Sequence, residues 1–290
     1  MKLVSFSEGG DGHRIGVVVQ DRVVDVSRHV ADAPRDMVVL IEHWSVWKAG
    51  FEALVNSESG DIGVADVTLL PPVARPGKIF GIGLNYADHI AESGMARPAE
   101  QVWFTKAVTS VNAPFGDLEL PLVSTQLDYE AELAFVIGKR CRHVPADRAH
   151  EVIFGYCAAN DVSVRDWQLK TSQFVLGKSF DTHCPYGPWI VTPDELGDPH
   201  TLGIRAFVNG ELRQNSNTSA LIYNCFEQVA CLSQAMTLEP GDLILSGTPG
   251  GVGIGFKPPR WLKAGDVVRI EVDRIGAIEN RVATENVRSA

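Results

Sequence analysis

The sequence predicts an α+β protein, in which a mixed β-roll or sandwich domain follows a small β-rich N-terminal domain. Short β-like runs recur at close spacing after residue 77, and only two or three segments have a helical pattern. A proline-rich segment at 70–77 interrupts regular structure, because proline removes a hydrogen-bond donor and restricts the residue before it. We therefore expect a small domain at 1–73 and a larger one at 74–290.

The N-terminal part is expected to form an antiparallel meander followed by a helix. Residues 2–6, 14–20 and 23–26 alternate or run apolar, and turn residues separate them. Between 35 and 55, apolar residues recur at roughly helical spacing, which indicates a helix with one packing face.

The larger part is expected to consist mainly of strands. Asn209-Gly210 is a strong hairpin signal, and the turns at 238–242 and 262–266 each lead into an apolar run. The best helix covers about 219–236, with Asn217 or Thr218 as its N-cap. Strands with so few helices favour a roll or sandwich over a regular βαβ array. The expected strands are 78–82, 101–106, 129–138, 154–159, 174–180, 187–191, 202–208, 242–246 and 266–273.

Composition limits the classes of partner and compartment. The 290 residues carry a net charge of −10 without clusters of Lys and Arg, which argues against nucleic acid or an anionic membrane surface as partner. A small molecule is the expected partner. No apolar run reaches the length of a membrane span and no signal-peptide pattern is present, so a cytoplasmic location is expected. The five cysteines form no CxxC pair, which argues against a disulfide framework or a thiolate zinc site.

The segment 128–137 opens with acidic residues and continues as an unbroken apolar run. Because successive side chains of a strand point to opposite faces, Glu130 and Glu132 share a face, about 6 to 7 Å apart along the backbone. Two like charges at the edge of a core are unfavourable unless a positive group lies between them, and a divalent cation is the usual solution. A solvated strand face without an ion is the alternative.

Two further charged residues are open to two interpretations each. Asp161 follows an apolar run and either caps a helical turn and pairs with Arg165, or supplies a third carboxylate to the same site. Three carboxylates without His or Cys would select a hard cation, Mg²⁺ or Mn²⁺. Lys178 lies within an apolar run, where it either extends its amine to solvent or is compensated by acidic metal ligands and donates hydrogen bonds or protons to a substrate.

His89 and Glu92 are three residues apart, which makes them neighbours on one face of a helix. Glu92 can accept a hydrogen bond from one ring nitrogen and orient the other to take a proton from water. Such pairs also occur by chance on exposed helices.

Two glycine-rich segments give weaker signals. The Gly81-Ile82-Gly83 pattern does not start a dinucleotide-binding loop, because Tyr86 stands where GxGxxG needs glycine. Residues 246–253 fit either an anion cradle that includes Thr248 or a tight connection, and they lack the GK[ST] ending of a phosphate loop.

Taken together, five motifs resemble the fumarylacetoacetate hydrolase family, and they occur in the family's order over about 78–282. The motifs are Gly-Leu-Asn-Tyr-Ala-Asp-His-Ile-Ala-Glu at 83–92, Asp-Tyr-Glu-Ala-Glu at 128–132, Asn-Asp-Val-Ser-Val-Arg-Asp-Trp-Gln at 160–168, Gly-Lys-Ser-Phe-Asp-Thr at 177–182 and Ser-Gly-Thr-Pro-Gly-Gly-Val-Gly at 246–253. The resemblance implies a β-roll catalytic domain, a smaller N-terminal domain and a homodimer. The longer fumarylacetoacetases have an additional aspartate ligand where this sequence has Leu84, so the resemblance favours the acylpyruvase-like branch.

The resemblance also implies roles for individual residues. Glu130, Glu132 and Asp161 would bind one Mg²⁺ or Mn²⁺ per subunit. His89 and Glu92 would activate a water molecule, and Lys178 would lie near metal and substrate. The implied substrate-binding residues are Tyr86, Arg165, Gln168 and Thr248, and Thr182 corresponds more loosely to a residue near the metal.

The implied reaction is hydrolysis of a carbon–carbon bond in a 2,4-dioxo acid of the acylpyruvate type, which yields a pyruvate-type product and a carboxylic acid. Decarboxylation of an oxaloacetate-like acid and isomerisation or tautomerisation of a 2-hydroxy-dienoate use the same metal–enolate chemistry and are the alternatives. A non-catalytic carboxylate-binding protein is a further alternative. We also expect residues 86–100 to form a lid that carries the His89–Glu92 pair.

Overall fold

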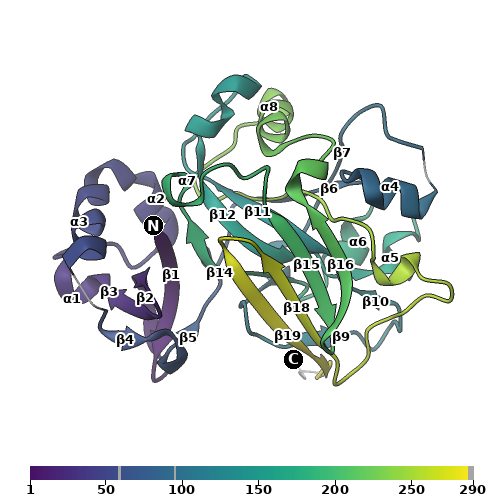
Figure 1. The fold of residues 1–290 in the computed structure, drawn as a ribbon, viewed down its shortest axis with the longest axis horizontal. Coiled ribbons are helices and arrows are strands. Elements are labelled where there is room, and N and C mark those ends of the chain that lie inside the picture. Colours follow the sequence, from purple (N-terminus) through teal and green to yellow (C-terminus); the bar gives the residue numbers. More distant parts are fainter. Residues whose placement is uncertain (58–59, 95, 287–290) are drawn as a thin grey trace.

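The structure is a computed structural model that describes residues 1–57, 60–94 and 96–286. Within that part of the chain, a sheet of twelve mainly antiparallel strands packs against a second sheet of five strands, and short helices lie around them (Figure 1). In Figure 1, the N-terminal strands and helices (purple) form one end of the molecule, and the green and yellow strands of the second sheet cross the centre of the first. The expected α+β class is confirmed.

The large sheet connects the N-terminal strands directly to the centre of the molecule, because β1 pairs with β14. The expected domain boundary after residue 73 stays a prediction. Along the sheet the strands are β4 (Ile62–Gly63), β3 (Arg22–Asp25), β2 (Asp11–Val19), β1 (Lys2–Glu8), β14 (Cys184–Val191), β12 (Ile153–Asn160), β11 (Ala131–Ile137), β17 (Leu243–Leu245), β6 (Ile79–Gly83) and β7 (Val102–Thr105), with β5 (Thr68–Leu69) beside β1 and β8 (Val111–Asn112) beside β14.

The second sheet continues the antiparallel pattern up to its last strand. Its order is β16 (Glu211–Asn217), β15 (Gly203–Val208), β18 (Val267–Val272), β19 (Gly276–Thr284) and β9 (Leu118–Leu120), and β9 runs parallel to β19. The pair β10 (Leu127–Asp128) and β13 (Ser163–Val164) stands apart from both sheets.

The helices are short, apart from α3 and α8. They are α1 (Val26–His29), α2 (Met37–Glu42), α3 (Trp44–Ser57), α4 (Ala87–Ser93), α5 (Arg165–Gln168), α6 (Val175–Lys178), α7 (Pro193–Leu196) and α8 (Cys225–Ala235). The 3-10 helices are η1 (Val64–Asp66), η2 (Val108–Ser110), η3 (Ala146–Glu151), η4 (Thr218–Ala220) and η5 (Gly253–Gly255). None of the described helices has the length and apolar character that crossing a bilayer would require.

Strand β11 lies at the centre of the structure because both of its faces are buried. Leu133 and Phe135 belong to the core shared with the five-stranded sheet. Ala134 and Val136 point the other way, into the core that the N-terminal strands and α2 and α3 cover. Strand alternation thus explains why this segment has an unbroken apolar sequence: each face meets a different core.

Most of the expected elements are confirmed, including the N-terminal meander, now β1 to β3, and the Asn209-Gly210 hairpin between β15 and β16. Both hairpin residues have positive φ, 52° and 80°, as a two-residue turn of this kind requires. Helical structure at 35–55 is confirmed, but the one helix expected there is divided at His43 into α2 and α3.

Two local expectations are wrong. The segment 174–180 contains the single helical turn α6 and no strand. A Cβ on Gly177 would lie 2.2 Å from the backbone nitrogen of Gln168, so glycine allows α6 to pack directly on α5. Helix α8 starts at Cys225, and its N-cap is Asn224, which forms a capping box with Glu227. Asn217 caps only the short turn η4.

His183, just before β14, is a fully buried histidine. Its Nε2–H donates to the carbonyl oxygen of Glu119 at 2.8 Å. Burial lowers the pKa of the ring to about 3, because the protonated form cannot be solvated there. In the unfolded chain the pKa returns to about 6.5. At pH values between these two pKa values, the unfolded state therefore binds one more proton than the folded state.

We expect the stability that this neutral ring contributes to be complete above about pH 6.5 and to be lost as the pH falls toward 3. In the wild type, this ring should lower the free energy of unfolding by about 3 kcal/mol between pH 6.5 and pH 4. Replacing His183→Gln should remove that part of the pH dependence. The exposed His43→Gln is the matched control and should keep the wild-type dependence. Urea unfolding at several pH values measures both, and a wild-type slope in the His183 variant would contradict this account.

Candidate metal centre and active site

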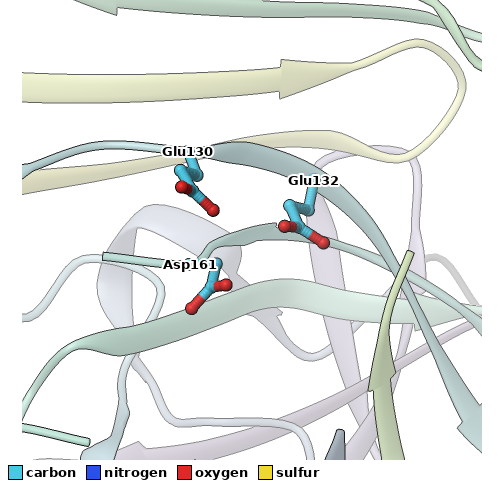
Figure 2. A group of neighbouring side chains, drawn as sticks. All are labelled: Glu130, Glu132 and Asp161. Carbon is cyan, nitrogen blue, oxygen red and sulfur yellow. The ribbon is translucent and has the colours of Figure 1, made fainter. Parts of the chain in front are cut away.

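Three carboxylates from two separated segments meet at one point (Figure 2). Glu130 and Glu132 lie at the start of β11, and Asp161 directly follows β12. These two strands are antiparallel neighbours, and the N–H of Asp161 donates to the carbonyl oxygen of Glu130 at 2.9 Å. One oxygen from each carboxylate lies within 4.8 Å of the others, and all three side chains are buried.

Strand alternation explains why the carboxylates share a side of the sheet. Glu132 has the same parity along β11 as Ala134 and Val136, which face the N-terminal core. Asp161 has the same parity along β12 as Cys157 and Ala159, which face that core too. Strand register and alternation together therefore place the three acids on one side of the sheet, at the edge of the N-terminal core.

Cations compensate two of the three carboxylates. The Nζ of Lys178 lies 2.7 Å from an oxygen of Glu130 and 2.7 Å from an oxygen of Asp161. The Nζ of Lys106 lies 2.6 Å from the other oxygen of Asp161, and Nη1 of Arg165 lies 2.7 Å from Glu130. Burial alone would raise the pKa of Glu130, but the charges of Lys178 and Arg165 outweigh it and lower this pKa to about 2. Burial would lower the pKa of Lys178, yet the two carboxylates raise it, so this lysine stays charged.

Glu132 is different, because no described lysine, arginine or histidine lies within ion-pair distance of it. It accepts a hydrogen bond from the backbone N–H of Gly247 at 2.6 Å. Burial, and then the charges of Asp161 and Glu130, raise its pKa well above the usual value. A buried acid next to two others, with only oxygen donors in the cluster, matches the requirements of a hard divalent cation such as Mg²⁺ or Mn²⁺. The residues present therefore fit a metal of this class.

Arg165 is held by several acceptors and keeps one nitrogen free. Its Nε donates to Asp128 at 2.8 Å, and its Nη1 donates to Gln168 at 2.9 Å as well as contacting Glu130. Its Nη2 is buried and has no hydrogen-bond partner among the described residues. Of the two interpretations of Asp161, the pair with Arg165 is wrong, because Asp161 contacts the two lysines and lies with Glu130 and Glu132.

A cavity of about 380 Å³ opens beside this cluster. Its ionisable lining consists of His89, Glu92, Glu130, Arg165, Lys178 and Lys257. Its apolar lining includes Leu84, Phe104, Phe174, Val252 and Ile254, and the amine of Lys178 lies 4.9 Å from the ring centre of Phe104. A small polar ligand with an apolar part fits a lining of this kind.

The His89–Glu92 pair lies on α4 and lines the same cavity. The distance from Nδ1 of His89 to Oε2 of Glu92 is 3.7 Å, which is too long for a hydrogen bond but close enough for an ion pair. The backbone N–H of Gly251 lies 3.0 Å from both oxygens of Glu92. Burial would raise the pKa of Glu92, but His89 and this N–H lower it, so Glu92 is ionised. Catalytic pairs are often loose before substrate binds.

The remaining predicted site residues fall into two groups. Gln168 and Thr248 line the cavity, and the hydroxyl of Thr248 accepts a hydrogen bond from Gln214 at 2.8 Å. Tyr86 and Thr182 are not among the lining residues. Tyr86 is fully buried, and burial and the charge of Glu132 raise its pKa. The hydroxyl of Thr182 accepts from the N–H of Glu119 at 2.9 Å, so its place near the metal stays a prediction.

The expected lid at 86–100 includes α4, whose C-cap Gly94 has a φ of 66°. Residue 95 lies outside the described residues. The hydroxyl of Ser216 donates to Asp88 at 2.6 Å, which connects α4 to β16. Movement of this segment stays a prediction.

Two important residues were missed in the sequence. Lys106 has a fully buried side chain and contacts Asp161, and like Lys178 it belongs to a mainly apolar segment, at the end of the strand expected at 101–106. Asp128 is fully buried and accepts four hydrogen bonds, from Arg165 and from the N–H groups of Tyr129, Gly253 and Ile254. No local pattern indicates that this acid joins two segments more than 80 residues apart.

Comparison with known proteins agrees with this geometry. The family model described as "Fumarylacetoacetate (FAA) hydrolase C-terminal" matches residues 78–283. The mitochondrial oxaloacetate tautomerase fahd2 of Xenopus laevis is 42% identical over 97% of this chain and 90% of its own length.

Two solved structures extend the comparison. Maleylpyruvate hydrolase from Sphingobium sp. SYK-6, in complex with manganese(II) and pyruvate, is 33% identical with a TM-score of 0.83 over 99% of this chain and 100% of that one. The 2-hydroxyhepta-2,4-diene-1,7-dioate isomerase of Mycobacterium marinum is 32% identical with a TM-score of 0.76 over 99% of both chains.

These relatives are named for tautomerase, hydrolase and isomerase activities, as expected for an enzyme family, and one of them has manganese bound. The match covers the carboxylate cluster, the cavity and α4. From the family model and from relatives of this similarity and coverage, we conclude that the chain belongs to the fumarylacetoacetate hydrolase family.

Proposed function

We propose that this chain is a divalent-metal-dependent hydrolase that cleaves a carbon–carbon bond in a 2,4-dioxo acid of the acylpyruvate type. The products are a pyruvate-type acid and a second carboxylic acid. The observation that carries the proposal is that Glu130 of the carboxylate cluster and the His89–Glu92 pair line one cavity. We also propose that the functional unit is a homodimer that acts on a small oxo acid.

Glu130, Glu132 and Asp161 would hold Mg²⁺ or Mn²⁺. Bound there, the ion would supply positive charge next to the negative charge that develops on the substrate. The free Nη2 of Arg165 is available to the substrate carboxylate, since every other nitrogen of that guanidinium already has an acceptor. The charged amine of Lys178 adds a second donor at the same end of the cavity.

His89 would take a proton from a water molecule, and the ionised Glu92 would stabilise the resulting charge on the ring. The hydroxide adds to the distal carbonyl carbon. The bond between this carbon and the methylene carbon then breaks, and its electron pair passes to the departing enolate. Lys178 is the candidate donor of the proton that the enolate carbon takes up.

Tautomerisation of oxaloacetate is a second candidate, favoured by the 42% identity to an oxaloacetate tautomerase. This reaction and the related isomerisation or decarboxylation also form an enolate. They differ from hydrolysis in needing no water at the distal carbonyl, so His89 would act only as a proton carrier.

Replacing Glu132→Gln should abolish Mn²⁺ binding and reduce turnover on the order of a hundred-fold or more, because glutamine keeps the shape of the side chain but cannot become the third anionic ligand. Calorimetric Mn²⁺ titration and an activity screen of acylpyruvates, oxaloacetate and dienedioates measure the two effects. The exposed Glu151→Gln serves as control and should behave as wild type. Full activity in a folded Glu132 variant would eliminate the proposal.

Turnover in ¹⁸O-water distinguishes hydrolysis from the other reactions. Hydrolysis places one ¹⁸O atom in the carboxylic acid product, and replacing His89→Asn should slow it about 10²- to 10⁴-fold without weakening Mn²⁺ binding. Enol-to-keto conversion of oxaloacetate, followed by ultraviolet absorbance, tests the second candidate. If oxaloacetate is tautomerised rapidly and no acylpyruvate gives a carboxylic acid product that contains ¹⁸O, the tautomerase replaces the hydrolase proposal.

A further inference from the structure

The cavity has a cation at its outer rim that the proposed reaction does not use. Lys257 lines the cavity and is exposed, and its amine forms no ion pair or hydrogen bond with the described residues. The two acids that line the same cavity are engaged elsewhere: Glu92 with His89 and the N–H of Gly251, and Glu130 with Lys178 and Arg165.

The backbone around Lys257 is firmly positioned. The N–H groups of Gly253 and Ile254 donate to Asp128 at 2.7 and 3.0 Å, and the N–H of Arg260 donates to the carbonyl oxygen of Gly253 at 2.9 Å. The guanidinium groups of Arg213 and Arg260 lie 5.3 and 4.7 Å from the ring centre of Phe256. These contacts fix the residues on either side of Lys257, so its Cα has a defined place at the rim.

The same aspartate positions the cation at the deep end. Asp128 accepts from Nε of Arg165 at 2.8 Å, and the unpartnered Nη2 of Arg165 is buried. Asp128 therefore fixes the positions of both the Arg165 guanidinium and the turn that precedes Lys257. Apolar side chains, including Phe104 and Val252, line the cavity together with these two cations.

We propose that Lys257 is a specificity-determining residue that selects 2-oxo acids whose acyl end carries a second carboxylate. The deep end, with Arg165 and Lys178, binds the 2-oxo acid group, the apolar wall contacts the carbon chain, and Lys257 pairs with the terminal carboxylate. This inference rests on the proposed function, because it takes the 2-oxo acid end of the substrate to lie at the carboxylate cluster.

The expected preference is modest because Lys257 is exposed. An exposed ion pair gives about three- to five-fold in affinity, and salt weakens it further. Neutral acyl chains of the same length should therefore still bind, but less tightly.

Binding is measured by calorimetry with Mn²⁺ present, so that the test does not depend on turnover. The probes are 2-oxo-dicarboxylates of five, six and seven carbons, each paired with its neutral terminal carboxamide. Wild type should bind at least one dicarboxylate about three- to five-fold more tightly than its carboxamide at low salt. Lys257→Met should remove this preference and Lys257→Arg should keep it. Lys263→Met removes a nearby exposed lysine that does not line the cavity, and it should leave the preference unchanged.

An equal preference in wild type and in Lys257→Met would overturn the inference, as would equal binding of both members of every pair by wild type. A preference that disappears in Lys257→Met supports it, even if no compound is cleaved. In that case the failure belongs to the proposed hydrolase and not to Lys257, because binding and turnover are measured separately.

Discussion

The structure depends on keeping three carboxylates close together away from water. Like charges in a buried site are tolerated only where opposite charges or hydrogen-bond donors balance them. Lys106, Lys178 and Arg165 supply that balance for Glu130 and Asp161, whereas Glu132 has only a backbone N–H among the described residues. The cluster therefore offers oxygen ligands and one uncompensated carboxylate, which is what a hard divalent ion requires of a binding site.

The sheet beneath the site explains how such a cluster can be assembled reliably. Strands β11 and β12 are buried on both faces, so a shift in register would move large apolar side chains out of two cores at once. The packing of Leu133 and Phe135 on one side and of Val136 on the other therefore also determines where Glu132 points. In this fold, the packing of the β11 side chains determines both the geometry of the site and the stability of the core.

Much of this arrangement could be predicted from sequence, because its signals are local. Alternation placed Glu130 and Glu132 together, helical spacing paired His89 with Glu92, and the Asn209-Gly210 turn indicated its hairpin. The errors arose where tertiary contacts decide. An apolar run as short as 174–180 fits strand or helix, and only the packing of Gly177 against Gln168 selects the helix. Likewise, the roles of Asp128 and Lys106 depend on partners that are far away in the chain.

The bonds of Asp128 have a consequence for how this pocket can diverge. Because one buried carboxylate holds both Arg165 and the turn at 253–254, remodelling that turn would disturb the guanidinium at the opposite end. Glycine is also required at 253, where a Cβ would lie 2.5 Å from Asp128. New substrate selectivity can therefore arise more easily by substituting side chains along the walls and rim of the cavity than by changing the backbone between them.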